Sequence, residues 1–164
     1  MPLTSNITAI NDDEEEETNP FNSLPSYIST SVDVASRRVI ESNMGHQAYD
    51  SSSYPIIEIT LSETGILNGV GNVTNMGTWV DNYRREGITF NTGIGVFSTP
   101  DGLSTAPWKA YDMGTTNETG DRTFKGLLIF ENNANGELSF LANTEWLYII
   151  KLSDPQPTVR MWEW

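Results

Sequence analysis

Apolar and polar residues alternate along much of the chain, which is the pattern expected of strands that bury one face. The clearest examples are 123–130 and 138–142, where apolar side chains recur at every second position on either side of a polar interval. That interval contains Asn135-Gly136, a pair that readily adopts the positive φ angles of a tight reversal. The pattern therefore predicts a β-hairpin over Thr123–Thr144.

The same reasoning predicts a succession of short strands along the rest of the chain. They cover 31–40, 54–61, 66–80, 88–97, 106–114, 146–152 and 159–164, with turns at 63–65, 100–102 and 154–157. No helical pattern of about ten or more residues interrupts them. We therefore expect an all-β protein of eight or nine antiparallel strands, and favour a closed barrel over a sandwich because closure removes exposed strand edges.

Glycines recur within two of the predicted strands. Gly69, Gly71 and Gly77 share one parity in the segment 66–80, and Gly93 and Gly95 share a face of the next strand. Glycine within a strand marks a bulge, a tight bend or the close approach of another group. Repetition on one face favours the curvature of a barrel wall.

Length and charge divide the chain into two parts. A chain of 164 residues suits one domain, which we place at 31–164, after an acidic flexible tail at 1–30 that carries the run Asp12–Glu17. We favour a solvated run over a cation-binding one. The net charge of −13 argues against binding to nucleic acid or to an anionic membrane.

Targeting signals are not visible in the sequence. The N-terminal residues lack a basic segment followed by an apolar run, and no stretch approaches 18 consecutive apolar residues. This favours the cytoplasm and no insertion into a membrane.

Residue types restrict the chemistry further. The chain has no cysteine, so a thiol nucleophile and a cysteine metal site are excluded, and its one histidine, His46, lies in a predicted polar loop. Gly93-Ile94-Gly95 continues a strand rather than opening a helix, so it is not a dinucleotide-binding loop. We expect no metal and no cofactor.

Several polar and aromatic residues are candidates for lining the interior of the barrel and binding a ligand there. They are Asn72, Asn75, Trp79, Trp108, Tyr111 and Tyr148. A buried amide requires a hydrogen-bond partner that a ligand can supply, and aromatic rings form apolar walls. The alternative is that the asparagines face outward or are satisfied by neighbouring backbone, and that the rings are ordinary core.

Candidate acid–base residues are the carboxylates within or beside apolar strands, Glu58, Glu131 and Glu145, together with Tyr111. A carboxylate removed from water acquires a raised pKa and can act as a general acid or base. The alternative is that these side chains face solvent.

The order of several short motifs resembles that of small archaeal and bacterial proteins whose barrels are similar to allene oxide cyclase and, in shape, to lipocalins. The motifs are VTNMGTW at 73–79, GIGVFSTPDG at 93–102, FKGLLIF at 124–130, GELSFLANT at 136–144 and MWEW at 161–164. The resemblance implies the barrel fold. Barrels of this shape include cyclases that fold a reactive apolar substrate and carriers that only bind one.

We therefore expect a barrel that binds a small, mainly apolar molecule in its interior. A cofactor-independent isomerase or cyclase that acts by positioning its substrate is the first alternative. A structural or assembly module is the second, and a homo-oligomer is compatible with each of the three.

Overall fold

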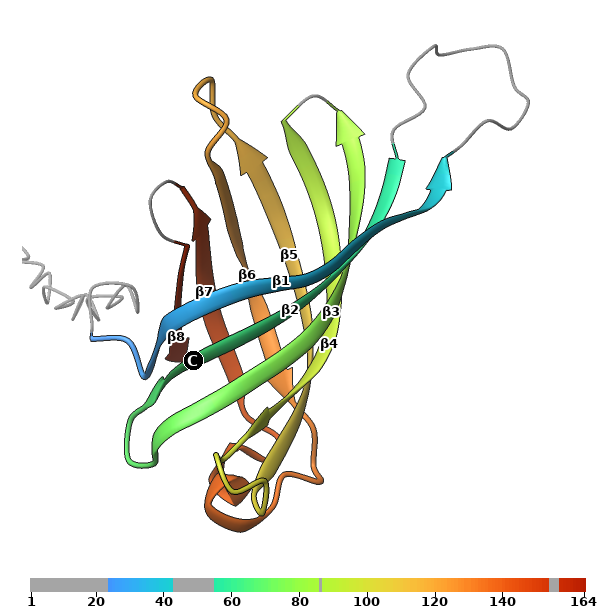
Figure 1. The fold of residues 1–164 in the computed structure, drawn as a ribbon. Coiled ribbons are helices and arrows are strands. Elements are labelled where there is room, and N and C mark those ends of the chain that lie inside the picture. Colours follow the sequence, from blue (N-terminus) through green and yellow to red (C-terminus); the bar gives the residue numbers. More distant parts are fainter. Residues whose placement is uncertain (1–23, 43–54, 86, 154–156) are drawn as a thin grey trace, which may run out of the picture.

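The structure, a computed structural model, describes residues 24–42, 55–85, 87–153 and 157–164. In this part of the chain, eight antiparallel strands follow one another around a closed barrel (Figure 1). The strands are β1 (Tyr27–Ser42), β2 (Pro55–Leu67), β3 (Gly71–Arg85), β4 (Ile88–Ser98), β5 (Thr105–Thr116), β6 (Arg122–Phe130), β7 (Glu145–Leu152) and β8 (Thr158–Glu163). The predicted all-β class and closed barrel are confirmed.

The barrel begins earlier in the chain than predicted. β1 starts at Tyr27, inside the segment predicted as a tail, and the Tyr27 side chain is completely buried in the core. The acidic run at 12–17, His46 and most of the turn at 154–157 lie outside the described residues.

The two ends of the barrel differ. At one end, the connection between β6 and β7 contains a short 3-10 helix, η2 (Gly136–Leu141). Its residues Leu138 and Leu141 are completely buried against the core, so η2 closes this end. We call the opposite end, where the end of β1 and the start of β2 splay outward to the right of the view, the open end (Figure 1).

β1 and β8 are neighbours over a short distance only. The register pairs Tyr27 with Met161 and Ile28 with Arg160, and the Val159 backbone N–H donates to Ser29 Oγ at 2.7 Å. Closer to the open end, the ladder of β1 continues with β2 alone. The inner face of β1 can therefore line a space there instead of packing against β8.

The prediction of a hairpin at Asn135-Gly136 is wrong. Asn135 is extended, with φ −139°, and Gly136 begins η2 with φ 58°. The Asn135 side chain accepts the backbone N–H of Thr105 and donates to Thr105 Oγ1, both at 3.0 Å. Leu138 and Leu141 are three residues apart, which is the repeat of a 3-10 helix, and both pack into the barrel. Tertiary packing therefore overrides the strand pattern.

The predicted turn at 63–65 is also wrong, because these residues lie within β2. The chain reverses between Leu67 and Gly71 instead, and Gly69 and Gly71 adopt φ angles of 81° and 103°. The single strand predicted over 66–80 is therefore divided between the end of β2 and β3. Gly69 and Gly71 serve this turn rather than the curvature of the wall.

Glycines on the inner face of the wall lie against aromatic rings. A Cβ atom on Gly77 or Gly95 would come within 2.7 or 2.3 Å of the Trp108 ring, and one on Gly93 within 2.6 Å of Trp79. The same relation holds for Gly65 and Tyr27, and for Gly114 and Phe124. The glycines therefore let large rings fill a narrow interior.

Candidate ligand-binding site

A cavity of about 180 Å³ lies inside the barrel at the open end. Its wall is mostly apolar and includes Val32 of β1, Ile59 and Leu61 of β2, Phe124 of β6 and Ile150 of β7. Ile57, Ile59 and Leu61 alternate along β2 and share one face, and the last two of them line the cavity. The cavity also has a polar side.

That polar side consists of Asp81, Asp112, Arg122 and, from β1, Arg37. Arg122 Nη2 donates to Asp81 Oδ2 at 3.0 Å, and the guanidinium lies 4.7 Å from the centre of the Phe124 ring. Burial raises the pKa of Asp81 above its ordinary value, and the hydrogen bond and charge of Arg122 partly offset this rise. The cavity thus contains an ion pair removed from bulk water.

Asp112 forms a second buried pair with Tyr148. Tyr148 Oη donates to Asp112 Oδ2 at 2.6 Å, and Asn91 Nδ2 donates to Asp112 Oδ1. Burial raises the pKa of Asp112, which these two donors partly counteract. Burial and the neighbouring carboxylate raise the pKa of Tyr148 well above its usual range, so this hydroxyl keeps its proton.

The Asp112–Tyr148 pair depends on the residue between its two strands. The register places Asp112 on β5, Gly126 on β6 and Tyr148 on β7 in one row. A Cβ atom on Gly126 would come within 2.5 Å of Asp112 Cβ and 2.8 Å of Tyr148 Oη. Glycine therefore leaves the space through which Tyr148 reaches Asp112 across an intervening strand.

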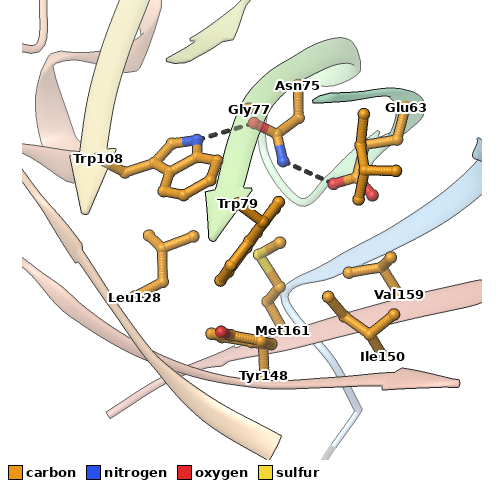
Figure 2. A pocket seen from close by; sticks show the side chains of 11 residues that line it. Glu63, Asn75, Gly77, Trp79, Trp108, Leu128, Tyr148, Ile150, Val159 and Met161 are labelled. Carbon is orange, nitrogen blue, oxygen red and sulfur yellow. Dashed lines mark hydrogen bonds between the residues drawn. The ribbon is translucent and has the colours of Figure 1, made fainter. Parts of the chain in front are cut away.

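A smaller cavity lies deeper in the barrel (Figure 2). Its volume of about 20 Å³ is enough for about one water molecule. Leu61, Trp79 and Ile150 line both cavities, so the two spaces adjoin. The indole rings of Trp79 and Trp108 lie 5.5 Å apart beside the deeper one.

A buried hydrogen-bonded chain borders this deeper cavity. Trp108 Nε1 donates to Asn75 Oδ1 at 2.7 Å, and Asn75 Nδ2 donates to Glu63 Oε1 at 2.7 Å (Figure 2). Tyr27 Oη also donates to Glu63 Oε1, at 3.3 Å. Burial raises the pKa of Glu63 to about 7, while the bonds from Asn75 and Tyr27 act in the opposite direction. Glu63 can therefore bind or release a proton near neutral pH.

Four of the predicted ligand-binding residues lie together in the interior. Asn75, Trp79, Trp108 and Tyr148 all line the deeper cavity, and each is buried. The other two lie on the outside of the wall. Asn72 is exposed near the start of β3, and 53% of the Tyr111 side chain is exposed on β5.

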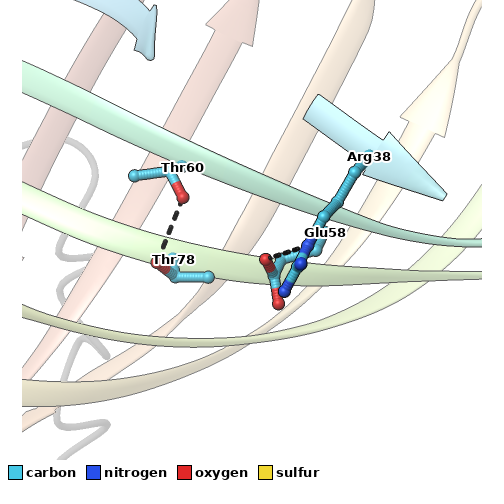
Figure 3. A network of polar contacts seen from close by, with 4 residues as sticks. All are labelled: Arg38, Glu58, Thr60 and Thr78. Carbon is cyan, nitrogen blue, oxygen red and sulfur yellow. Dashed lines mark hydrogen bonds and ion pairs between the residues drawn. The ribbon is translucent and has the colours of Figure 1, made fainter. Parts of the chain in front are cut away.

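The predicted acid–base residues do not reach the interior. Arg38 Nε donates to Glu58 Oε1 at 2.7 Å on the outer wall, beside the Thr60–Thr78 hydrogen bond (Figure 3). Glu131 pairs with Lys109 at 2.7 Å, also outside. Glu145 is exposed, like Tyr111.

The interior carboxylates are instead Glu63, Asp81 and Asp112, which sequence reasoning missed. The strand alternation could have identified two of them. Glu63 is two residues from Leu61, and Asp81 is two residues from Trp79, so each carboxylate lies on the same face of its strand as an inward apolar residue. The turn wrongly placed at 63–65 removed Glu63 from consideration. Within the described ranges, no three His, Cys, Asp or Glu side chains are grouped so as to hold a metal ion. Among these same residues there is also no helix with the length and apolar character to cross a membrane.

The fold and the site together define a closed eight-stranded antiparallel β-barrel with an interior cavity that is apolar on most sides and charged on one. Comparison of the chain with protein-family models, with curated proteins and with solved structures finds no match.

Proposed function

We propose that the barrel binds a small, mainly apolar molecule in the cavity at its open end. The observation that carries this proposal is the cavity of about 180 Å³ with Ile59, Leu61 and Phe124 on its wall and two buried polar pairs beside them. Ligand sites combine an apolar lining, which supplies most of the affinity, with a few fixed polar groups that set orientation. A fully filled barrel would favour a structural module instead.

The polar pairs suit a ligand that carries a hydrogen-bonding group at one end. Arg122 uses one N–H on Asp81, and its other N–H groups form no further hydrogen bond among the described residues. Asp112 is held by Tyr148 and Asn91. A polar group of the ligand would meet donors and acceptors whose positions are already fixed, so little ordering would be needed on binding.

Titration with N-phenyl-1-naphthylamine, whose fluorescence rises in apolar surroundings, tests this proposal. We expect saturable binding at one site per chain. Ile59→Trp fills the cavity and should weaken binding at least tenfold, whereas Ile56→Trp, on the outer face of the same strand, should leave it unchanged. Equal affinities of both variants and the unmodified protein would refute the proposal.

The second candidate function is a cofactor-independent isomerase or cyclase, of the kind that the resemblance to allene oxide cyclase implies. The observation that favours it is the Asp112–Tyr148 pair, because Asp112 also lines the cavity. A buried carboxylate of raised pKa beside an apolar space can exchange a proton with a substrate, and the wall can fold that substrate.

Stereochemistry tests this second function. An allene oxide that is generated in solution closes without protein to a racemate, because its surroundings are not chiral. With the protein present, an excess of one enantiomer is expected. This closure opens the epoxide C–O bond and forms a C–C bond without transferring a proton, so a lower closure rate of Asp112→Asn would show that the carboxylate stabilises the charge that develops on the opened substrate. A racemic product would exclude this cyclisation, and an undiminished rate in the variant would leave positioning alone as the cause.

A further inference from the structure

The outer face of β7 has a pattern that is complementary to itself. Alternate residues of β7 point outward, and they are Glu145, Leu147, Ile149 and Lys151. Glu145 and Lys151 are exposed, and neither forms an ion pair within the described part of the chain. If a second β7 runs antiparallel over this one, each Glu145 meets a Lys151 and each Leu147 meets an Ile149.

The apolar surface continues over the neighbouring strands. The exposed fractions of Ile94 on β4 and of Tyr111 and Met113 on β5 are 62%, 53% and 45%, and Leu127 and Ile129 lie outward on β6. We call the outward residues of β4 to β7 the apolar wall. The opposite side of the barrel also exposes apolar residues, among them Ile66 and Met76, but β1 and β2 carry the Arg38–Glu58 ion pair there (Figure 3).

Charge is distributed unevenly between these two sides. The chain has 22 acidic residues, yet no outward residue within β4, β5 or β6 is acidic. Depletion of charge and enrichment of aromatic and apolar residues are features of the centre of protein–protein interfaces. In a chain of net charge −13, the lack of outward acidic residues on these three strands lowers the repulsion between two copies that meet there.

We propose that the apolar wall binds a second copy of this chain, with the two β7 strands antiparallel about a two-fold axis. The row Asp112–Gly126–Tyr148 crosses β7 midway between Glu145 and Lys151. An axis along this row crosses the neighbouring strand β6 at Gly126, so Leu127 of one copy lies opposite Lys125 of the other, beside the pairs on β7. Tyr111 and Met113 on β5 lie further around the barrel and border this contact.

The area of the wall limits how tightly two copies can bind one another. Four strands about 4.8 Å apart and about six residues long cover roughly 20 by 20 Å measured along the wall. They form half of the circumference of the closed barrel, so the part that one partner can contact is smaller. The contact therefore stays below the roughly 800 Å² per partner of specific interfaces and resembles the small, transient ones. We therefore expect a reversible dimer with a dissociation constant in the micromolar range.

Other occupants fit this wall less well. β4 to β7 are hydrogen-bonded on both sides, so they offer no free edge for an added peptide strand. Anionic lipid surfaces require clustered basic residues, whereas Lys109 is paired with Glu131 and only Lys125 and Lys151 remain on the wall. A second copy supplies the opposite charge at both ends of β7.

Sedimentation velocity over a dilution series from about 100 µM chain downward tests the proposal, because it gives the dissociation constant of each protein. Exchanging the two charges of β7 is the most specific comparison. The unmodified protein should have twice the 18.3 kDa mass of the chain. Lys151→Glu places a second carboxylate against Glu145 of the other copy and should weaken the dimer at least tenfold. The combined variant Glu145→Lys with Lys151→Glu should restore the dimer, because the two charges only change places.

Arg84→Glu is the matched control, since it changes the net charge by the same amount at an exposed position of β3. This variant should remain dimeric, and circular dichroism should show an unchanged fold in all four proteins. A monomeric unmodified protein at this concentration would overturn the proposal. A dissociation constant of Lys151→Glu that rises less than tenfold, a swap variant that dimerises as weakly as Lys151→Glu, or an Arg84→Glu variant that is weakened to the same extent would do so equally.

Discussion

Replacing Glu63 by Gln should make the barrel more stable at alkaline pH and change it little at acidic pH. The pKa of Glu63 rises from 4.5 to about 7 on folding, mainly because the carboxyl is buried. Between these two pH values the folded protein therefore holds a proton that the unfolded chain has released. The free energy of unfolding consequently falls as the pH rises from about 4.5 to 7, and this contribution is constant on either side.

The size of the effect follows from the shift. A change of one pKa unit corresponds to about 1.4 kcal/mol, so Glu63 costs the folded protein about 3 kcal/mol once both states are ionised. At pH 5 most of this penalty is absent. The glutamine side chain has nearly the same shape, does not titrate and keeps an oxygen to accept the bonds from Asn75 and Tyr27. The variant should thus gain about 2–3 kcal/mol over the unmodified protein between pH 5 and pH 8.

Urea unfolding of both proteins at pH 5 and pH 8 measures this difference. Asp81 and Asp112 also have raised pKa values, but they are present in both proteins and their contributions cancel. Glu58→Gln, in an exposed ion pair on the outer face of the same strand, should change stability by less than about 1 kcal/mol at either pH. A Glu63→Gln effect that is the same at both pH values would refute the reasoning.

Two further substitutions test the polar pairs of the site, each by urea unfolding at neutral pH. Gly126→Ala should destabilise the barrel by about 2–4 kcal/mol, since its Cβ would collide with the Asp112–Tyr148 pair, and a neutral result would show that the row is not so tightly packed. Arg122→Leu should cost about 3 kcal/mol because it leaves the buried Asp81 carboxylate unpaired, whereas Asp81→Asn with Arg122→Leu should recover part of that loss. No recovery in the double variant would argue against an energetic link between the two residues.

The architecture could be predicted from sequence because the signal repeats along the chain. On β7, Trp146, Tyr148 and Ile150 occupy alternate positions, and all three are buried. Strand alternation of this kind depends on burial alone, so local sequence is enough. The closed end could not be predicted in the same way. Leu138 fits a strand or a 3-10 turn equally well, and only contact with the barrel end decides between them.

The site could be predicted in part, for a related reason. Asn75 and Trp79 share the inward parity of β3, and the structure confirms that both lie inside. Tyr111 has the opposite parity to Trp108 on β5, so alternation, applied strictly, places it outside. The buried carboxylates were harder to find, because carboxylates are rarely buried and Asp112 is held by Tyr148 from a strand that lies two positions away.

Methyl NMR of isoleucine-labelled protein during titration with N-phenyl-1-naphthylamine tests the central claim most directly. Ile59 and Ile150 line the cavity at the open end, whereas Ile94 and Ile149 lie on the apolar wall outside. If the interior is the binding site, the δ1-methyl signals of Ile59 and Ile150 will shift and saturate together, and those of the outer residues will not. Saturable shifts confined to Ile94 and Ile149, or no shifts at any of the four, would contradict the account.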